Sequence, residues 1–420
     1  MDKQVGSTRS MIVIALLTAG LIFDGFDLVV YGTIVPTFLR DPSQIGPVDT
    51  RMAGLLGSWA LIGVLVGALL VGTFIDKIGR RKVLLVSYAW FGLGMLLTAF
   101  SHSTLVFGSL RFFTGLGVGG VLATTGALVA EYAPPHRRNL FTAIAYSGVP
   151  MGSLLAAVTA MLLADDIGWR GMMLIGALPL VTLLPLAWIF LDESPAWLSE
   201  RKARSEAAPS GPAVERDVPA TAATGYRGLF RYHFADAMLV GFMSAIGLLL
   251  VYALNTWLPE LMIRAGFGAT RSLSFLVVMN GGAIGGALLG AYLADRKDPR
   301  RVVAVTFAMA AVAIPALSLG LSFAPTMLLV AIVGIGTSGT QILIYGLAAT
   351  RFPTSVRGAA VSWCAGFGRL GGVCGPLICG MLLSAGLSIE AVLRILAVTA
   401  VVGLLCALAL RKGASVTPQT

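Results

Sequence analysis

Long apolar runs alternate with short polar segments along the whole chain. A helix needs about 20 predominantly apolar residues to cross a bilayer. Twelve runs suit this length, at residues 11–39, 52–75, 83–100, 104–130, 139–163, 171–191, 234–257, 272–294, 302–322, 326–350, 358–384 and 387–410. The pattern therefore predicts an all-α membrane protein with twelve transmembrane helices.

Composition supports this prediction. Hydrophobic residues make up 57% of the 420 residues and charged residues 12%, whereas a soluble domain averages about 45–50% and about 25%. So little charge cannot cover a globular surface. The 30 Lys and Arg against 20 Asp and Glu would suggest nucleic acid in a soluble protein. Here we attribute the excess to membrane orientation and expect no nucleic-acid partner.

The basic residues are distributed unevenly among the loops. With the N-terminus inside, the inner segments hold 22 Lys and Arg, and the outer segments hold Arg40, Arg51, Arg170, Arg264 and Arg271. Cytoplasmic loops are enriched in Lys and Arg. We therefore expect both termini and the polar segment 192–233 in the cytoplasm. That segment is rich in Ala, Pro, Ser and charge, which favours a flexible linker with short interfacial helical pieces.

The linker separates an N-terminal half, 1–191, from a C-terminal half, 234–420, and the halves repeat at an offset of 219 residues. The offset aligns helix glycines and loop charges in one register: Gly63 with Gly282, Gly67 with Gly286, Gly115 with Gly334, Asp76 with Asp295 and Arg81 with Arg300. Two parallel six-helix repeats are the architecture of the major facilitator fold, whose site lies between the halves.

The loop GTFIDKIGRRKVLL joins the second and third spans. Gly72 would let two helices approach closely, Gly79 would permit a tight turn, and Asp76 would dock on a neighbouring helix N-terminus. With Arg80 and Arg81, the loop resembles the signature loop of the major facilitator superfamily, which implies a gating role. Positive-inside charge alone is the alternative interpretation.

The corresponding loop of the second half, GAYLADRKDPRR, keeps Asp295. It has Ala291 and Asp298 where the family often has glycine. We expect a gating role here also, with positive-inside charge again as the alternative.

Two acids interrupt the first span, in the stretch LIFDGFDLVVYG. Asp24 and Asp27 are three residues apart and therefore share a helix face. Packing of the first span against the fourth would bring Asp27 within reach of Arg111. A purely structural ion pair is one interpretation, but a second acid on the same face leaves surplus negative charge. Burial and a like charge favour a neutral carboxyl and an arginine favours a charged one, so the pair is suited to exchanging a proton.

The stretch GFGRLGG matches a dinucleotide-binding pattern through Gly366, Gly368 and Gly371. Such a site requires a preceding strand, whereas this stretch lies inside a predicted span. We therefore expect close helix packing at these glycines, as at the glycines of the eighth span, Gly281, Gly282, Gly285 and Gly286.

Arg369 lies within the same stretch, twelve residues after Arg357. At ~1.5 Å per residue this is about 18 Å along the helix, near the bilayer centre. A charge there costs at least ~2.5 kcal/mol, so we expect Arg369 to face a cavity and a partner. Arg394 follows Glu390 by one turn near a membrane surface, where an ordinary i,i+4 pair is expected.

Four segments together resemble the aromatic acid:proton symporter family: DGFD, RFFTGLGVGG, YALNTWLPEL and RFPTSVRGAAVSWCAGFGRLGG. The resemblance covers essentially the whole chain, although LATTG (122–126) lacks a Pro-Asn pair found in many members. It implies proton coupling or coordinated gating by Asp24 and Asp27. Further charged positions of the family match Arg111, Glu131, Arg357 and Arg369.

We therefore expect an importer of the bacterial inner membrane that moves an aromatic carboxylate, of benzoate or hydroxybenzoate type, together with a proton. Arg369 would bind the carboxylate through a forked contact. Residues that would flank the substrate are Arg111, Tyr31, Tyr252, Asn255, Gln341 and Tyr345. The expected gating residues are Gly72, Asp76, Gly79, Arg80, Arg81, Glu131, Arg138, Asp295 and Arg357.

The proton would be the coupling ion, with no cofactor, no metal and a monomeric chain. A proton-driven carrier of a non-aromatic organic acid is the nearest alternative. A transporter-like sensor would need an output domain, and residues 192–233 are too short and polar to form one. An enzyme is not expected, because the sequence shows no nucleophile–base constellation or metal-ligand cluster.

Overall fold

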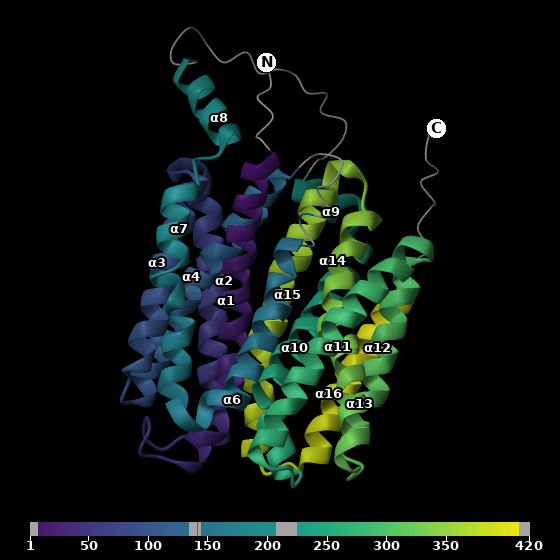
Figure 1. The fold of residues 1–420 in the computed structure, drawn as a ribbon. Helices are drawn as coiled ribbons and strands as arrows, with labels where there is room; N and C mark the ends of the chain where they lie inside the picture. The colour runs from purple at the N-terminus through teal and green to yellow at the C-terminus, as the bar shows by residue number, and fades with distance from the viewer. Residues whose placement is uncertain (1–6, 134–140, 142–143, 207–224, 411–420) are drawn as a thin grey trace. The chain divides into compact units, whose positions relative to one another are not determined.

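The computed structural model describes residues 7–133, 141, 144–206 and 225–410 (Figure 1). Within these ranges the chain is helical and forms no β-strand. The α-helices are α1 (Ser7–Arg40), α2 (Thr50–Ile78), α3 (Arg80–Ala99), α4 (Thr104–Tyr132), α6 (Gly148–Gly176), α7 (Leu183–Phe190), α8 (Pro195–Glu206), α9 (Gly225–Tyr232), α10 (Phe234–Arg264), α11 (Ala269–Arg296), α12 (Pro299–Ala316), α13 (Phe323–Gly334), α14 (Thr340–Arg351), α15 (Thr354–Ser384) and α16 (Ile389–Ala409). The predicted all-α class is confirmed.

Eleven stretches of the described residues are long and apolar enough to cross a membrane. Ten of them match single predicted spans. The other, Ile144–Phe190, has 47 residues and overlaps both predicted spans 139–163 and 171–191. Inside α6 the backbone leaves the helical region at Gly168, where φ is 63° and ψ is −178°. This φ is unfavourable for residues with a Cβ atom, so a glycine suits the turn.

The helices form two compact units. The first comprises Met1–Glu215, Asn255–Val277 and Pro376–Ser384, and the second comprises Arg216–Leu254, Val278–Gly375 and Ala385–Thr420. The predicted linker contains α8 and α9 within its described part, in agreement with the short helical pieces expected there.

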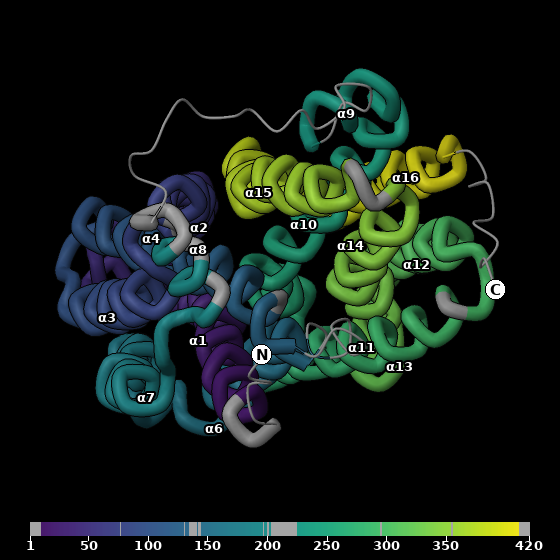
Figure 2. The backbone as a smooth tube through the Cα atoms, turned by 90° about the horizontal axis from the view of Figure 1, so that it is seen from above, coloured from purple at the N-terminus to yellow at the C-terminus, as the bar shows by residue number. Residues whose placement is uncertain are grey.

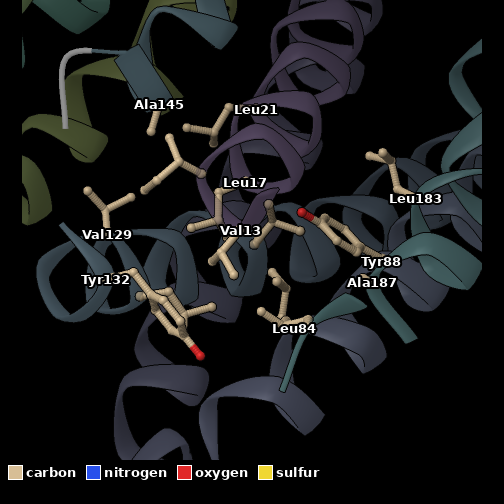
Figure 3. Packing of buried hydrophobic residues seen from close by; sticks show 14 of the residues in the cluster. Val13, Leu17, Leu21, Leu84, Tyr88, Val129, Tyr132, Ala145, Leu183 and Ala187 are labelled. Atoms are coloured by element: carbon tan, nitrogen blue, oxygen red, sulfur yellow. The ribbon is translucent and has the colours of Figure 1, made fainter. Parts of the chain in front are cut away.

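A buried apolar cluster holds α1 in the first unit (Figure 3). Val13, Leu17 and Leu21 recur every four residues and therefore lie on one face of α1. This face packs in a cluster with side chains of α3, α4 and α7, and Tyr88 of α3 donates a 3.1 Å hydrogen bond to the Leu16 carbonyl. The apolar face fixes the rotation of α1 and thereby the direction of its polar residues.

The internal repeat is present in the helix contacts of each unit. In the first unit, a Cβ added at Gly63 of α2 would lie 2.1 Å from the Phe112 carbonyl oxygen of α4. In the second, a Cβ at Gly282 would lie 2.4 Å from the Ala331 carbonyl oxygen. Both members of the second pair follow the first by 219 residues. A second repeated pair of contacts has the same geometry. A Cβ at Gly115 would lie 2.1 Å from the Ala60 carbonyl oxygen, and one at Gly334 would lie 1.9 Å from the Met279 carbonyl oxygen. Glycine is required because the helix backbones touch.

The close-packing prediction was right for some glycines and wrong for others. Gly371 faces the backbone of α10, and Gly282 and Gly286 face residues 331 and 335. Gly366, Gly281 and Gly285 have no atom within 4 Å of an added Cβ. The wrong predictions follow from helix geometry, since only one face of a helix meets a given neighbour.

These two classes of glycine on α15 provide a stability test. A Cβ at Gly371 would lie 1.8 Å from the Ala245 carbonyl oxygen, whereas Gly366 is open. Gly371→Ala is expected to destabilise the protein by about 1–3 kcal/mol through overpacking. Gly366→Ala is expected to be neutral, or to stabilise the helix by up to about 1 kcal/mol. Melting temperatures of the purified variants in detergent check this, and equal melting of the two variants would contradict the packing assignment.

Candidate functional site

A buried ion pair joins α1 and α4. Asp27 is 5% exposed and Arg111 is 2% exposed, and Arg111 Nη1 donates a hydrogen bond to Asp27 Oδ1. The Arg111 guanidinium also lies over the Tyr31 ring, 5.6 Å from its centroid, and Nη1 lies 3.9 Å from Met95 Sδ. The predicted contact is therefore present, and Tyr31 belongs to the same cluster.

The glycine between the two acids has a packing role. A Cβ at Gly25 would lie 1.9 Å from the Val149 carbonyl oxygen of α6, and one at Gly152 would lie 1.7 Å from the Ile22 carbonyl oxygen of α1. Contact of α1 with α6 at this depth leaves no room for water between the two backbones. Asp24 is half-buried on the same turn as buried Asp27. The acids thus lie beside a dry helix contact, where charge is expensive.

Arg111 retains hydrogen-bonding capacity beyond the ion pair. Its Nε is buried and has no hydrogen-bond partner among the described residues. Burial of an unused donor is unfavourable. The site therefore favours an additional negative or hydrogen-bond-accepting group near this guanidinium.

A second polar cluster lies in the second unit, on α10, α14 and α15. Gln341 is 5% exposed, and its Nε2 donates a 2.9 Å hydrogen bond to Ser244 Oγ. Tyr345 interacts with Gln341, Ser244 and the charge of Arg369. Arg369 is half-buried, and its charge acts on Tyr345. Three predicted substrate-binding residues, Gln341, Tyr345 and Arg369, thus come together.

A π-helical turn directly precedes this cluster. Residues Ile335–Gly339 connect α13 to α14, so Gln341 is the second residue of α14. A π-turn places one extra residue in the helix and thereby rotates the side chains of all later residues about the helix axis. Such turns are frequent at functional sites. The turn therefore sets the direction of Gln341 and Tyr345, one turn apart on α14.

Two other predicted residues lie on α10. The half-buried Tyr252 presents its ring to Gly372, whose added Cβ would lie 3.0 Å away. Asn255 is 1% exposed, and its backbone carbonyl oxygen would lie 2.0 Å from a Cβ at Gly32 of α1. Gly32 thus permits close contact of α1 with α10 within the first unit.

The loop between α2 and α3 makes the tight turn predicted at Gly79, where φ is 106°. Arg80 Nε lies 3.2 Å from Glu131 Oε1, and Arg81 Nη2 donates a 2.7 Å hydrogen bond to the Trp188 carbonyl. The Arg81 backbone N–H donates to Glu193 at 3.0 Å. The loop is therefore tied to the ends of α4 and α7.

The remaining predicted gating residues differ in their surroundings. Gly72 has no atom within 4 Å of an added Cβ, so the predicted close helix approach at this position is wrong for this structure. Arg357 is exposed, and its Nε donates a 3.4 Å hydrogen bond to the Phe352 carbonyl. The side chains of Asp76 and Asp295, and the whole of Arg138, lie outside the described residues.

Glu260 of α10 is a candidate that the sequence-based predictions missed. It is 3% exposed and lies between two arginines, 3.0 Å from Arg40 of α1 and 2.7 Å from Arg264. The sequence signal was an acid in an otherwise apolar stretch, one turn before an arginine. Ser244 was also missed, because an uncharged residue in a membrane span gives no comparable signal. The surface pair predicted for Glu390 and Arg394 is present at 3.1 Å.

Comparison with known proteins gives three kinds of match: a family model, solved structures and curated relatives. A model of the Major Facilitator Superfamily matches residues 17–353 and 282–419. Among solved structures, the crystal structure of a D-xylose-proton symporter gives a TM-score of 0.74 at 19% identity and covers 95% of this chain and 96% of that chain. The inward open xylose transporter XylE from E. coli gives 0.75 at 17% identity, covering 97% and 98%. These structures show the fold.

Curated relatives are similar over most of their length. The benzoate transport protein of Acinetobacter baylyi is 34% identical over 92% of this chain and 88% of its own. The gentisate transporter of Corynebacterium glutamicum is 32% identical over 88% and 80%. The gallate transporter of Pseudomonas putida is 31% identical over 97% and 93%.

The buried pair predicts a strong dependence of each partner on the other. Asp27→Asn leaves Arg111 buried without its counter-charge, and breaking a buried pair in this way costs about 3–5 kcal/mol. The double variant Asp27→Asn/Arg111→Met removes both charges and keeps apolar volume, so it is expected to recover most of the lost melting temperature. The coupling would be contradicted if the melting temperature of the double variant fell by as much as those of Asp27→Asn and Arg111→Met together.

Proposed function

Because the chain belongs to the Major Facilitator Superfamily, we propose that it imports a small aromatic carboxylate of benzoate or hydroxybenzoate type together with a proton. The chain is a multi-pass transporter of the bacterial inner membrane and not an enzyme. The observation that carries the substrate and the coupling is the presence of a charged cluster within candidate membrane spans of each unit. One contains Asp27 paired with Arg111, with Asp24 on the same turn of α1, and the other contains Arg369 on α15.

We propose twelve transmembrane helices, in halves 1–191 and 234–420 with both termini in the cytoplasm, and a monomeric working unit. The turn at Gly168 supports this count, since it divides the long stretch Ile144–Phe190. The repeated glycine contacts support the halves. Transport would proceed by rocking of these halves around the substrate.

Arg369 is the proposed anchor for the substrate carboxylate. A guanidinium presents two parallel N–H groups to a carboxylate, and charge-assisted bonds of this kind are stronger than neutral ones. Tyr345 and Gln341 lie in the same cluster and offer a ring and an amide to the aromatic part. The names of the relatives, benzoate, gentisate and gallate, are those of aromatic carboxylates.

Asp24 and Asp27 are the proposed proton carriers. Arg111 compensates one negative charge, and its unused Nε offers a hydrogen-bond donor to a further carboxylate nearby. Protonation of an acid would reduce the charge that must be moved through a low-dielectric region. Loading of the proton and of the substrate would then permit the change of access, because each ligand stabilises the same state.

The Arg40–Glu260–Arg264 cluster is a proposed closure of the outer side. With the N-terminus in the cytoplasm, the last residues of α1 lie outside. The two helices that carry Arg40 and Glu260, α1 and α10, are in backbone contact in this structure: a Cβ at Gly32 would lie 2.0 Å from the Asn255 carbonyl oxygen. Opening of this contact would separate Glu260 from Arg40 and leave Arg264 as its counter-charge.

Proton coupling can be separated from substrate exchange in liposomes. The wild type is expected to accumulate labelled benzoate or 4-hydroxybenzoate when the outside is acid, and to exchange it in counterflow without a gradient. Asp24→Asn and Asp27→Asn are expected to lose acid-driven accumulation, because the carboxyl can no longer cycle its proton, while retaining measurable counterflow. Acid-stimulated uptake of wild-type size in both variants would refute the assignment. Counterflow of aliphatic acids or sugars, with none of benzoates, would refute the substrate class.

Substrate anchoring by Arg369 has its own readout. Loss of a charge-assisted hydrogen bond costs about 1.5–3 kcal/mol, so Arg369→Gln is expected to weaken benzoate binding by at least tenfold. Arg394→Gln is the matched control, because Arg394 is 69% exposed in its side chain and pairs with Glu390. Equilibrium binding of labelled substrate to purified protein measures both. Wild-type affinity in Arg369→Gln would remove this residue from the site.

A further inference from the structure

Helix α9 has two faces of different chemistry, and the proposed transport steps use neither. Gly228 and Leu229 are buried, whereas Arg227 and Arg231 are exposed one turn apart and share a face. Tyr226 and Phe230 form a neighbouring stripe, with ring centroids 6.3 Å apart. Viewed from above, α9 lies on the outer edge of the second unit (Figure 2). An edge position leaves its exposed side chains accessible to lipid.

Helix α9 is fixed to the membrane-spanning helices of its unit. The Phe230 ring meets the Trp363 ring of α15 edge-on at 4.9 Å. Trp363 in turn donates a 2.9 Å hydrogen bond from Nε1 to the Ala237 carbonyl of α10 and stacks on Phe367 at 4.8 Å. The orientation of α9 is therefore set by three aromatic rings and one hydrogen bond, and its exposed face is a defined surface.

This surface lies where a bilayer interface is expected. The candidate span Phe234–Arg264 begins two residues after α9 ends. Tyr226, Tyr232 and Phe234 are 51%, 61% and 58% exposed. Aromatic side chains are favoured at the boundary between headgroups and acyl chains, and an amphipathic helix with arginines on its polar face lies along that boundary.

The charge of the surface is positive. Its cations are Arg227 and Arg231; Arg357, a further cation of this unit, bonds to the Phe352 carbonyl. The Phe352 ring meets the ring of His233, next to α9, at 5.9 Å. Within residues 225–240 the sequence contains one acid, Asp236, and Arg351 holds it through bonds of 3.0 and 2.6 Å. No carboxylate of this segment is therefore available to neutralise the two arginines of α9.

We propose that the α9 surface is a binding site for an anionic phospholipid, with Arg227 and Arg231 on the headgroup phosphate and Tyr226, Tyr232 and Phe234 at the acyl boundary. Basic residues next to a membrane surface attract anionic lipid. The exposed aromatic rings favour a lipid over a soluble polyanion, which would leave them in water. The bound lipid would stabilise α9 and, through Trp363, the helix that carries Arg369.

Thermal unfolding of the full-length protein in detergent tests this site. Phosphatidylglycerol is expected to raise the melting temperature of the wild type more than phosphatidylcholine does. In Arg227→Gln/Arg231→Gln this difference is expected to be lost, and in Arg227→Lys/Arg231→Lys to be partly kept, because lysine retains the charge. Arg394→Gln, at an exposed arginine of α16, is the control and is expected to keep the full difference.

Three results would overturn the proposal. Equal stabilisation of the wild type by both lipids would show no headgroup selectivity. A full phosphatidylglycerol effect in the glutamine variant would place the lipid elsewhere. An equal effect of inorganic phosphate would show a free-anion site. Native mass spectrometry provides a second readout that does not depend on unfolding: the wild type should retain phosphatidylglycerol, and the glutamine variant should retain at least tenfold less.

Discussion

The contact between Asp27 and Arg111 is the interaction on which the structure and its proposed use both depend. A charge inside a membrane is expensive unless it has a partner, and these two side chains are 5% and 2% exposed. The pair fixes α1 against α4, while the apolar cluster around Val13, Leu17 and Leu21 fixes the rotation of α1. This leaves the second acid, Asp24, half-buried on a helix that already carries a compensated charge. Protonation of one of these two neighbouring acids is the coupling step that we propose.

The repeat separates the scaffold from the chemistry. Glycines that allow backbone contact recur at the same offset in both halves, together with the residues they touch. The charged residues of the two buried clusters do not recur, although loop charges such as Asp76 and Asp295 do. The position that corresponds to Arg111 is Val330, and the position that corresponds to Arg369 is Pro150. Each unit therefore has its own polar cluster on a shared packing plan, which suits a transporter that must bind a proton and a substrate at different places.

The sequence was sufficient for features that carry a strong energetic signal. Apolar length predicted the spans, and the cost of buried charge predicted the pairing of Asp27 with Arg111. It was insufficient where the outcome depends on a neighbouring helix. Gly366 and Gly371 lie in one motif, but only Gly371 faces a backbone. Ser244 and the π-turn at Ile335–Gly339 have no charge or periodicity to reveal them. The burial of Glu260 between two arginines requires the packing of α1 on α10.

The most direct test of the central claim is a measurement of proton uptake when the substrate binds. Purified protein in weakly buffered solution near neutral pH, with an indicator dye, would receive benzoate, which is already ionised under these conditions. If the acids of α1 are neutralised as the carboxylate is bound, the wild type takes up protons and Asp24→Asn/Asp27→Asn does not. Proton uptake of equal size in that variant, with substrate binding intact, would contradict the account.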